Sequence, residues 1–299
     1  MKTQSLVLLL LFLSLKVSSQ NTLSHFYELA DKRDTVNELL LLKNWEISSP
    51  NDPDLYVAWF NYYYQVSMDE IVHLSTDSKA RGYAKIVDPV TEKKVGTIYS
   101  EIAYLPDKVK KAFNYINKGI GMFPDRLDMR FGKVFLYGEL GDYDNFTNEI
   151  IDNIEYSYQI RNNWKWKDNK PLQNPEDLFL STIHSYQIQI YNTNNDSLLS
   201  NMARIAAAVL KYYPNHIESI NDLSIVLLIK KDYPGAIEYL HKAEQHSPND
   251  CVVLGNLAQA YRLSGDTENA KKYLEKIMKV GNQNEKEEAR RRMKEIKNN

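Results

Sequence analysis

A repeat of 34 residues in the C-terminal part of the chain constrains its fold more than any other feature. With Ile217 as position 1, apolar or small residues recur at fixed positions and a proline closes the unit: Ile220, Leu223, Ser224, Leu227, Ala236, Leu240, Ala243 and Pro248. The pattern returns in the next 34 residues at Leu254, Leu257, Ala258, Tyr261, Ala270, Leu274 and Ile277, with Gly265 between its two halves. A fixed period of this length is typical of stacked structural repeats.

The spacing within one unit predicts two antiparallel helices. Positions 4, 7 and 11 lie on one face of a first helix. Small residues at positions 8 and 20 allow the two helices to approach closely, and positions 24 and 27 pack the second helix on the next unit. A proline near position 32 ends the second helix because it lacks an N–H. The sequence therefore predicts an all-α solenoid of helical hairpins in which Ala236 and Ala270 are buried.

Further closing prolines extend the pattern towards the N-terminus. Pro214 lies 34 residues before Pro248, and Pro124 and Pro50 close earlier units. The intervals from Pro50 to Pro124 and from Pro124 to Pro214 exceed whole repeats, so each must hold an insertion. Residues 67–105 contain GYAKIVDPVTEKKVGTIY, which predicts a small β-hairpin, and residues 161–175 form a polar loop.

These boundaries divide the chain as follows: a signal peptide, 1–19; a degenerate helical pair, 20–52; a repeat with the hairpin insertion 67–105, 53–126; a repeat, 127–160; a divergent repeat with the polar loop 161–175, 161–214; two repeats, 217–250 and 251–284; and a polar capping helix, 285–299.

The pattern over residues 217–284 resembles the tetratricopeptide repeat (TPR), and Asn117–Lys133 is similar to segments of exported TPR proteins from Gram-negative bacteria. The resemblance covers most of residues 22–284. It implies a TPR-type solenoid and export from the cytoplasm, but no activity, since such proteins generally lack an assigned function. Asn282 departs from the pattern, because the last repeat would end in proline.

The N-terminus predicts an export signal. Lys2 precedes the apolar run LVLLLLFLSL at residues 6–15, which is too short to span a bilayer as a helix. Val17 and Ser19 place small residues before a cleavage point after Ser19. We expect a soluble periplasmic or secreted product without stable membrane insertion. Cys251 is the single cysteine, so no intrachain disulfide forms, and we interpret it as structural.

Charge and composition exclude other classes of protein. The net charge of −2 gives no basic stripe for nucleic acid, and the run Arg290–Arg292 has glutamates beside it on the same predicted helix. Only 11 glycines and 10 prolines occur, which disfavours a β-rich fold with frequent tight turns.

No recognised catalytic or metal-binding motif is present, and we expect neither cofactor nor metal. Two E-x-x-H tetrads, Glu70…His73 and Glu238…His241, have the form that supplies ligands in di-iron bundles, but we interpret them as coincidence. An unfamiliar enzyme site at Asp69, Glu70 and His73, on a predicted surface helix, is the weakest hypothesis. Gly119-Ile120-Gly121 is interpreted as a helix terminus and not as a phosphate loop.

Two surfaces are candidates for recognition. The first helices of stacked pairs line a concave groove, whose predicted contacts are Asn61, Tyr64, Phe131, Phe135, Gln187, Tyr191, Asn221, Ile225, Gln259 and Arg262. The lysines of a chaperone-type carboxylate clamp are absent from these positions. Trp164 and Trp166 in the polar loop either contact a ligand or fold back over the repeats.

The leading hypothesis is a non-enzymatic scaffold that binds a peptide or protein segment of the cell envelope in this groove. The alternative is a glycan or small-ligand binder that uses exposed loop aromatics, Trp164 and Trp166.

Overall fold

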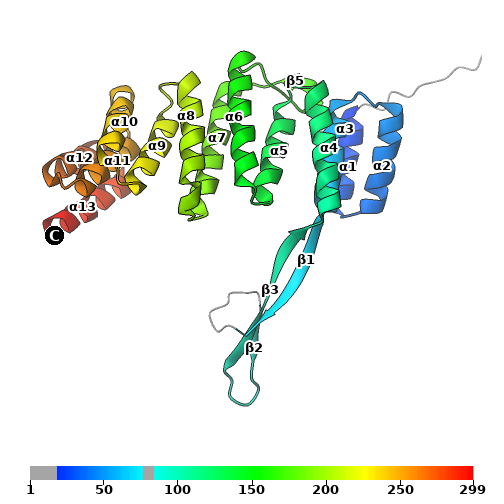
Figure 1. Ribbon diagram of the computed structural model, residues 1–299, viewed down its shortest axis with the longest axis horizontal. Coiled ribbons are helices and arrows are strands. Elements are labelled where there is room, and N and C mark those ends of the chain that lie inside the picture. Colours follow the sequence, from blue (N-terminus) through cyan, green and yellow to red (C-terminus); the bar gives the residue numbers. More distant parts are fainter. Residues whose placement is uncertain (1–18, 77–83, 299) are drawn as a thin grey trace, which may run out of the picture. The chain divides into compact units, whose positions relative to one another are not determined.

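The structure, a computed structural model, describes residues 19–76 and 84–298 (Figure 1). Its contacts separate into two compact units. Unit 1 comprises the described residues through Met129 together with Trp166–Lys170, and unit 2 comprises Arg130–Lys165 and the chain from Pro171 onwards. The predicted signal peptide, residues 1–19, lies outside the described residues except for Ser19, where the first helix begins.

Unit 1 is built from four helices, a 3-10 turn and one inserted sheet among its described residues. Its elements are α1 (Ser19–Asp31), α2 (Thr35–Ser48), α3 (Pro53–Gln65), β1 (Met68–Ser75), β2 (Ala84–Val87), β3 (Lys94–Tyr104), α4 (Pro106–Met122) and the 3-10 turn η1 (Lys167–Asn169). Its core is aromatic and aliphatic, and it includes Phe26, Leu42, Trp45, Leu55 and Trp59.

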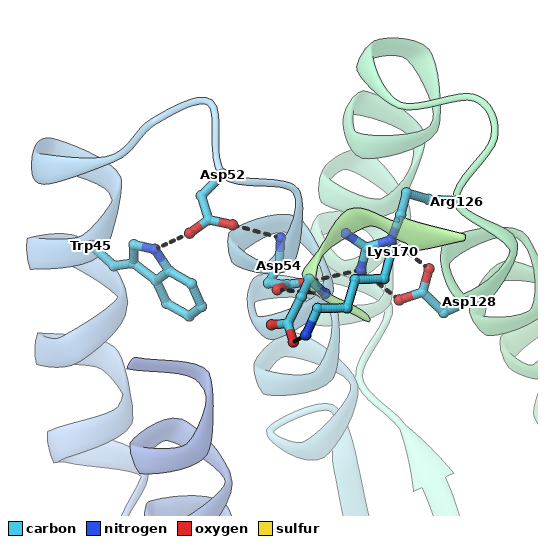
Figure 2. A network of polar contacts seen from close by, with 7 residues as sticks. Trp45, Asp52, Asp54, Arg126, Asp128 and Lys170 are labelled. Atoms are coloured by element: carbon cyan, nitrogen blue, oxygen red, sulfur yellow. Dashed lines mark hydrogen bonds and ion pairs between the residues drawn. The ribbon is translucent and has the colours of Figure 1, made fainter. Parts of the chain in front are cut away.

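A buried ion pair lies beside α3 in unit 1 (Figure 2). The guanidinium of Arg126 is fully buried; its Nη2 donates to Asp54 at 2.6 Å and to Asp128 at 2.7 Å, and its Nε donates to Asp128 at 2.9 Å. The second carboxylate oxygen of Asp54 accepts the backbone N–H of Asp168 at 3.2 Å, so η1 packs on the start of α3. Burial raises the pKa of Asp54 although the Arg126 charge opposes that shift.

The insertion between α3 and α4 is a three-stranded antiparallel sheet in the order β1–β3–β2. Figure 1 shows it projecting from the ends of α3 and α4. The hairpin of β2 and β3 is the predicted one. The third strand, β1, was not predicted, and the expectation of a surface helix at residues 69–73 is wrong, because these residues pair with β3 from Met68↔Tyr104 to Ser75↔Thr97.

Unit 2 continues as helical pairs. After α5 (Leu127–Glu139), which begins at the end of unit 1, its elements are α6 (Tyr143–Gln159), α7 (Pro175–Asn192), the 3-10 turn η2 (Asp196–Leu198), α8 (Leu199–Tyr212), α9 (Ile217–Ile229), α10 (Tyr233–His246), α11 (Cys251–Leu263), α12 (Thr267–Val280) and α13 (Gln283–Asn298). Two-residue strands β4 (Lys165–Trp166) and β5 (Lys170–Pro171) pair within the loop before α7.

Four of the helix pairs share one kind of turn. A residue at positive φ precedes an aspartate that caps the second helix: Arg33–Asp34, Gly141–Asp142, Lys231–Asp232 and Gly265–Asp266. The aspartate accepts the N–H three residues ahead, and its own N–H donates to the carbonyl five residues back. Since an N-cap of this type stabilises a helix by about 1 kcal/mol, the turn fixes where each second helix begins.

The small residues of the repeat pattern lie where close packing requires them. Ala236 and Ala270 have no exposed surface, and Ala243 and Ala258 are buried with Leu240, Leu254, Leu257 and Leu274. Because a methyl side chain lets two helices approach closely, the two halves of each pair share one continuous core. The predicted fold class, an all-α TPR-type array with a small β insertion, is confirmed.

Candidate functional site

The first helices of the pairs in unit 2 lie next to one another. Helix α7 contacts α9, and α9 contacts α11. On α5, the ring of Phe131 stacks on Phe179 of α7 with centroids 6.0 Å apart. We call the exposed side chains that α5, α7, α9 and α11 carry in unit 2 the first-helix face.

Some predicted groove residues are exposed or half-buried on this face. Phe135 on α5 is 43% exposed, and Tyr191 on α7 is 50% exposed. Arg262 on α11 is exposed, and Ile225 and Gln259 are half-buried. Gln259 also accepts hydrogen bonds from Arg262 at 3.2 Å and from Arg292 of α13 at 3.0 Å, so its amide is already held in place.

Three other predicted groove residues are buried instead, and their assignment to a partner surface is wrong. Phe131 is enclosed by Phe179 and by Tyr186, whose ring meets it edge-on at 5.9 Å. Gln187 faces α8, where its amide reaches backbone groups of that helix at 3.2 Å when oriented to satisfy both. Asn221 accepts a hydrogen bond from Asn256 on α11 at 3.3 Å. These side chains join neighbouring helices, because one turn of a helix presents both a solvent face and a packing face.

The two predicted groove residues in unit 1 are half-buried. Tyr64, at the end of α3, stacks on Tyr104 of β3 with centroids 6.2 Å apart. Asn61 lies near Tyr27 of α1 and partly offsets the rise that burial causes in the pKa of that tyrosine. Both residues therefore also connect α3 to neighbouring elements of unit 1.

Trp164 is a core residue and not a loop contact. It is 1% exposed, its Nε1 donates to Ser157 Oγ at 2.8 Å, and its ring stacks on Phe179 at 5.8 Å. The guanidinium of Arg130 lies 5.6 Å from the centre of the indole. Of the two alternatives drawn from the sequence, folding back over the repeats is confirmed for Trp164. Trp166 is half-buried, so neither tryptophan is the exposed ring that a glycan-stacking site needs.

A small pocket of about 190 Å³ lies where α7 and α9 end. Tyr191 and Ile190 of α7, Asn194 to Asp196, Leu199 and Met202 of α8, and Ile229 of α9 line it. Ile229 is exposed and ends α9, a position that the repeat pattern did not single out. Apolar walls with amide groups at the rim suit an apolar side chain of a bound peptide.

A cluster of ionisable groups joins α7 to α9 within unit 2. Nδ1 of His184 lies 3.0 Å from Oδ2 of the buried Asp222, and this hydrogen bond raises the pKa of His184. Burial raises the pKa of Asp222 and lowers that of His216, which precedes α9 and bonds Ser219 at 2.9 Å. No sequence spacing signals this cluster, because its members come from different helices.

A second polar network joins α10 to α11 and α12. Glu244 binds Lys276 at 2.6 Å, Tyr273 at 3.0 Å and His241 at 3.1 Å, and the other ring nitrogen of His241 lies 2.9 Å from the hydroxyl of Tyr261. Burial opposes ionisation of Glu244, but these hydrogen bonds outweigh it and hold the pKa of Glu244 below its usual value. A cavity of about 400 Å³ beside the network is lined by Glu244, Tyr273, Lys272, Glu275, Lys276 and Lys279.

Neither E-x-x-H tetrad forms a ligand set. Glu238 pairs with Lys242 at 2.8 Å, while His241 belongs to the network around Glu244. Glu70 and His73 lie on β1, where residues three apart point to opposite faces of the sheet. His73 stacks on Tyr99 and lies 3.0 Å from Glu101. Across residues 19–76 and 84–298, no three His, Cys, Asp or Glu side chains are grouped so as to hold a metal ion.

Within the same described ranges, no helix combines the length and the apolar character needed to cross a bilayer. The thiol of Cys251 is partly buried at the start of α11, and burial raises its pKa. A raised pKa leaves less of the reactive thiolate, which agrees with a structural cysteine.

Comparison with known proteins points to one kind of repeat. Residues 227–291 match the family model of the tetratricopeptide repeat. A comparison with curated proteins found no significant match.

Solved structures of similar fold contain such repeats. YrrB, titled a TPR protein with an unusual peptide-binding site, is 10% identical, with a TM-score of 0.41, and the match covers 80% of this chain and 92% of that one. A tetratricopeptide repeat protein from Parabacteroides merdae is 13% identical, with a TM-score of 0.38, covering 88% of this chain and 80% of its own. The complex of the yeast Sti1 TPR2AB domain with pHSP90 is 14% identical, with a TM-score of 0.34, covering 63% of this chain and 92% of its own. With TM-scores below 0.5, these likenesses carry no further argument; the family match itself shows tetratricopeptide repeat sequence in residues 227–291.

Proposed function

We propose that the chain is a non-enzymatic interaction scaffold whose first-helix face binds an extended segment of a partner protein in the cell envelope. The observation that supports this most is the exposure of large apolar and aromatic side chains on consecutive first helices. Phe135, Ile188 and Tyr191 are each more than two-fifths exposed on α5 and α7. Exposed aromatic side chains are enriched among the residues that dominate binding energy at interfaces.

The pocket beside Tyr191 gives this face one defined anchor point. Its volume of about 190 Å³ holds a single side chain, and its lining combines apolar walls with the amide groups of Asn194 and Asn195. A peptide lying across the first helices would place one apolar side chain there and hydrogen-bond its backbone to the amides.

A cross-linking experiment tests the proposed face directly. A photoreactive benzoylphenylalanine replaces Tyr191 in the full chain expressed in cells, and the adducts are identified by mass. The matched control carries the same group at Tyr158, which is 56% exposed but lies on the second helix α6. We expect a discrete protein adduct at 191 that is weak or absent at 158. Equal labelling at both positions would contradict the proposal.

Export is the second part of the proposal. It is supported by Lys2, by the apolar run of residues 6–15, and by small residues at Val17 and Ser19. Intact mass of the protein recovered from the periplasm or medium should correspond to a chain that begins at Gln20. Recovery of only the full-length chain in the cytoplasm would refute it.

A further inference from the structure

Helix α2 carries apolar side chains on two opposite faces. Leu42 and Trp45 lie on its buried face, in the core of unit 1. On the other face, Val36 is 77% exposed, Leu40 is 57% exposed and Ile47 is 82% exposed. A surface helix usually carries polar residues opposite its apolar stripe, so apolar residues on both faces indicate a helix with a second partner.

The exposed apolar residues of α2 lie on one line along the helix. Steps of four, three and four residues lead from Val36 to Leu40, then to the exposed Lys43, and on to Ile47. This alternation is the spacing of the two seam positions of a coiled coil. At about 100° per residue, these four residues fall within about 60° of one another and lie opposite Leu42. We call Val36, Leu40, Lys43 and Ile47 the α2 seam.

No other described element covers the α2 seam. Within unit 1, α2 packs on α1 and α3, and Figure 1 shows both of these helices on the same side of α2. Terminal helices of repeat arrays usually present a polar outer face, and α13 does so in unit 2. Within residues 283–296, the exposed side chains of α13 are Gln283, Asn284, Glu287, Glu288, Arg290, Arg291, Lys294 and Glu295. The outer face of α2 differs, because it is mainly apolar.

Two copies of the α2 seam complement each other when the helices run antiparallel about a two-fold axis beside residues 41 and 42. Val36 then meets Ile47 of the second copy, and Leu40 meets Lys43 of the second copy. Symmetry repeats both contacts, as in any isologous interface. The aliphatic stem of Lys43 covers Leu40 of the second copy, while its ammonium group reaches water beside the seam. The α2 seam is therefore complementary to itself.

Charge does not oppose this pairing. Lys43 is the one charged residue of the seam, and the exposed Asn37 and Asn44 beside it are neutral. Glu46, the nearest carboxylate along the helix, lies on the α3 side, where burial and then the charge of Glu46 raise the pKa of Tyr63. The pairing therefore brings no carboxylates together, and it sets only the two lysines against each other, at positions that solvent reaches.

The polar surface of α13 disfavours a head-to-tail chain of copies. Such a chain would place the α2 seam of one copy on α13 of the next, where the exposed side chains of residues 283–296 are charged or amide groups. A two-fold contact through α2 alone closes after two copies. We propose that two copies of this chain associate through the α2 seam as an antiparallel, two-fold symmetric dimer. This surface is separate from the first-helix face, and the dimer does not depend on binding there.

The length of α2 limits the strength of the dimer. Its 14 residues make a helix of about 21 Å, so the contact is smaller than the roughly 800 Å² per partner that is typical of stable complexes. Lys43 weakens the contact further, because a charged seam residue fixes the register while it lowers stability. We expect a reversible dimer with a dissociation constant on the order of 10 µM.

Sedimentation velocity measures this association. The chain from residue 20 onwards, the proposed exported form, is studied from about 1 µM to about 300 µM, a range that brackets the expected constant. Leu40→Glu should weaken the dimer at least about tenfold, since it buries a carboxylate in each half of the seam. Lys43→Leu should strengthen the dimer at least about tenfold, since it removes both charges from the seam. Circular dichroism should be unchanged in both variants, because both residues are exposed in the single chain.

Two control variants change exposed apolar residues elsewhere. Val252→Glu introduces the same carboxylate at the start of α11, where Val252 is 61% exposed, and it should leave the dissociation constant unchanged. Leu74→Lys alters β1, where Leu74 is 74% exposed, and it should also have no effect. Loss of the dimer in either control would place the contact on another surface and overturn the proposal.

Disulfide cross-linking tests the register. In a Cys251→Ser background, the double variant Val36→Cys with Ile47→Cys should form a disulfide-linked dimer on mild oxidation. Either new cysteine alone should not, because antiparallel pairing separates it from its own copy by about 16 Å along the helix axis. A disulfide needs Cα atoms within about 7 Å of each other. Positions 36 and 47 of a single chain are also about 16 Å apart, so no intrachain bond competes.

Three further results would overturn the proposal. The first is a monomer at every concentration, which would mean that the seam does not bind a second copy. The second is a Leu40→Glu variant that associates as strongly as the unmodified chain. The third is cross-linking of the single-cysteine variants at the same rate as the double variant, since that result is incompatible with the antiparallel register.

Discussion

The contribution of the buried Arg126 ion pair to the free energy of unfolding of unit 1 can be tested directly (Figure 2). Asp54→Ala removes the 2.6 Å contact to the guanidinium and the acceptor of the Asp168 N–H. Breaking a buried ion pair from one side destabilises a protein by about 3–5 kcal/mol, because the remaining charge stays out of water. Asp128 continues to bind Arg126 after this change and is itself partly exposed, so the low end, about 3 kcal/mol, applies.

Arg126→Met tests the same pair from the other side. It leaves Asp54 buried without a cation, and a buried carboxyl can relieve this by taking up a proton. Because the pKa of Asp54 in the folded state is raised above its unfolded value of about 3.9, protonation of the Asp54 carboxyl shifts the folding equilibrium towards the folded state. The loss of stability should therefore be largest at neutral pH and shrink as the pH falls through the folded pKa. The double variant Asp54→Leu with Arg126→Met should recover most of the loss, since apolar residues of similar volume replace a buried pair at little expense.

The assay is urea unfolding followed by tryptophan fluorescence. Trp45 and Trp59 lie in the core of unit 1 and report on its unfolding. Lys170→Met is the matched control, because it removes the exposed partner of Asp168 in the same network and should change the free energy of unfolding by less than about 1 kcal/mol. A loss below 1 kcal/mol for Asp54→Ala, equal to that of the control, would refute the reasoning.

Three further changes follow from the structure. Gly119→Ala should destabilise unit 1 by about 1–3 kcal/mol in urea unfolding, because the new Cβ would lie 2.8 Å from a tyrosine carbon of α3. Gly121→Ala is the control: a Cβ there has nothing within 4 Å, so the change should be neutral or should stabilise by about 0.5–1 kcal/mol. A larger loss of stability for Gly121→Ala than for Gly119→Ala would contradict this packing. Glu244→Gln should lower the stability of unit 2 at pH 7 and have a smaller effect at pH 3. Because the pKa of Glu244 is lowered in the folded state, its carboxylate stabilises the fold above the unfolded-state pKa, and this contribution is lost as the pH falls through the folded-state pKa. An equal loss of stability at both pH values would argue against this role of Glu244. The pKa of His184, measured by NMR titration, should lie above the reference value of about 6.5. Its contribution to stability should be complete below the reference pKa and decrease as the pH rises through the folded-state pKa. A measured pKa below 6.5 would show that the hydrogen bond to its carboxylate partner on α9 is absent.

Local periodicity accounts for the parts of the fold that could be predicted. Ala236 and Ala270 recur at one position of the repeat, and both are fully buried where two helices meet. The predicted start of a repeat at Ile217 is also the first residue of α9. Apolar and small residues at helical spacing specify a face, and a face specifies which side of each helix must be covered.

The candidate site was predictable only in part. Phe135 and Tyr191 are exposed on first helices, but Phe131, Gln187 and Asn221 are buried at contacts between helices. The position of a residue in the repeat predicts the direction in which its side chain points from its own helix. Whether that side chain is exposed depends on how the neighbouring helix packs against it.

The sequence by itself determined that this chain folds as TPR-type helical hairpins with a β insertion, because that information is repeated at short range along the chain. Tertiary structure alone decided that Trp164 turns inwards, that β1 is a strand, and that Arg126 meets Asp54. These outcomes depend on partners distant in sequence: Asp54 lies 72 residues from Arg126, and β1 becomes a strand only by pairing with β3. An isolated strand or buried charge is unfavourable until its partner is in place, so short-range patterns cannot specify it.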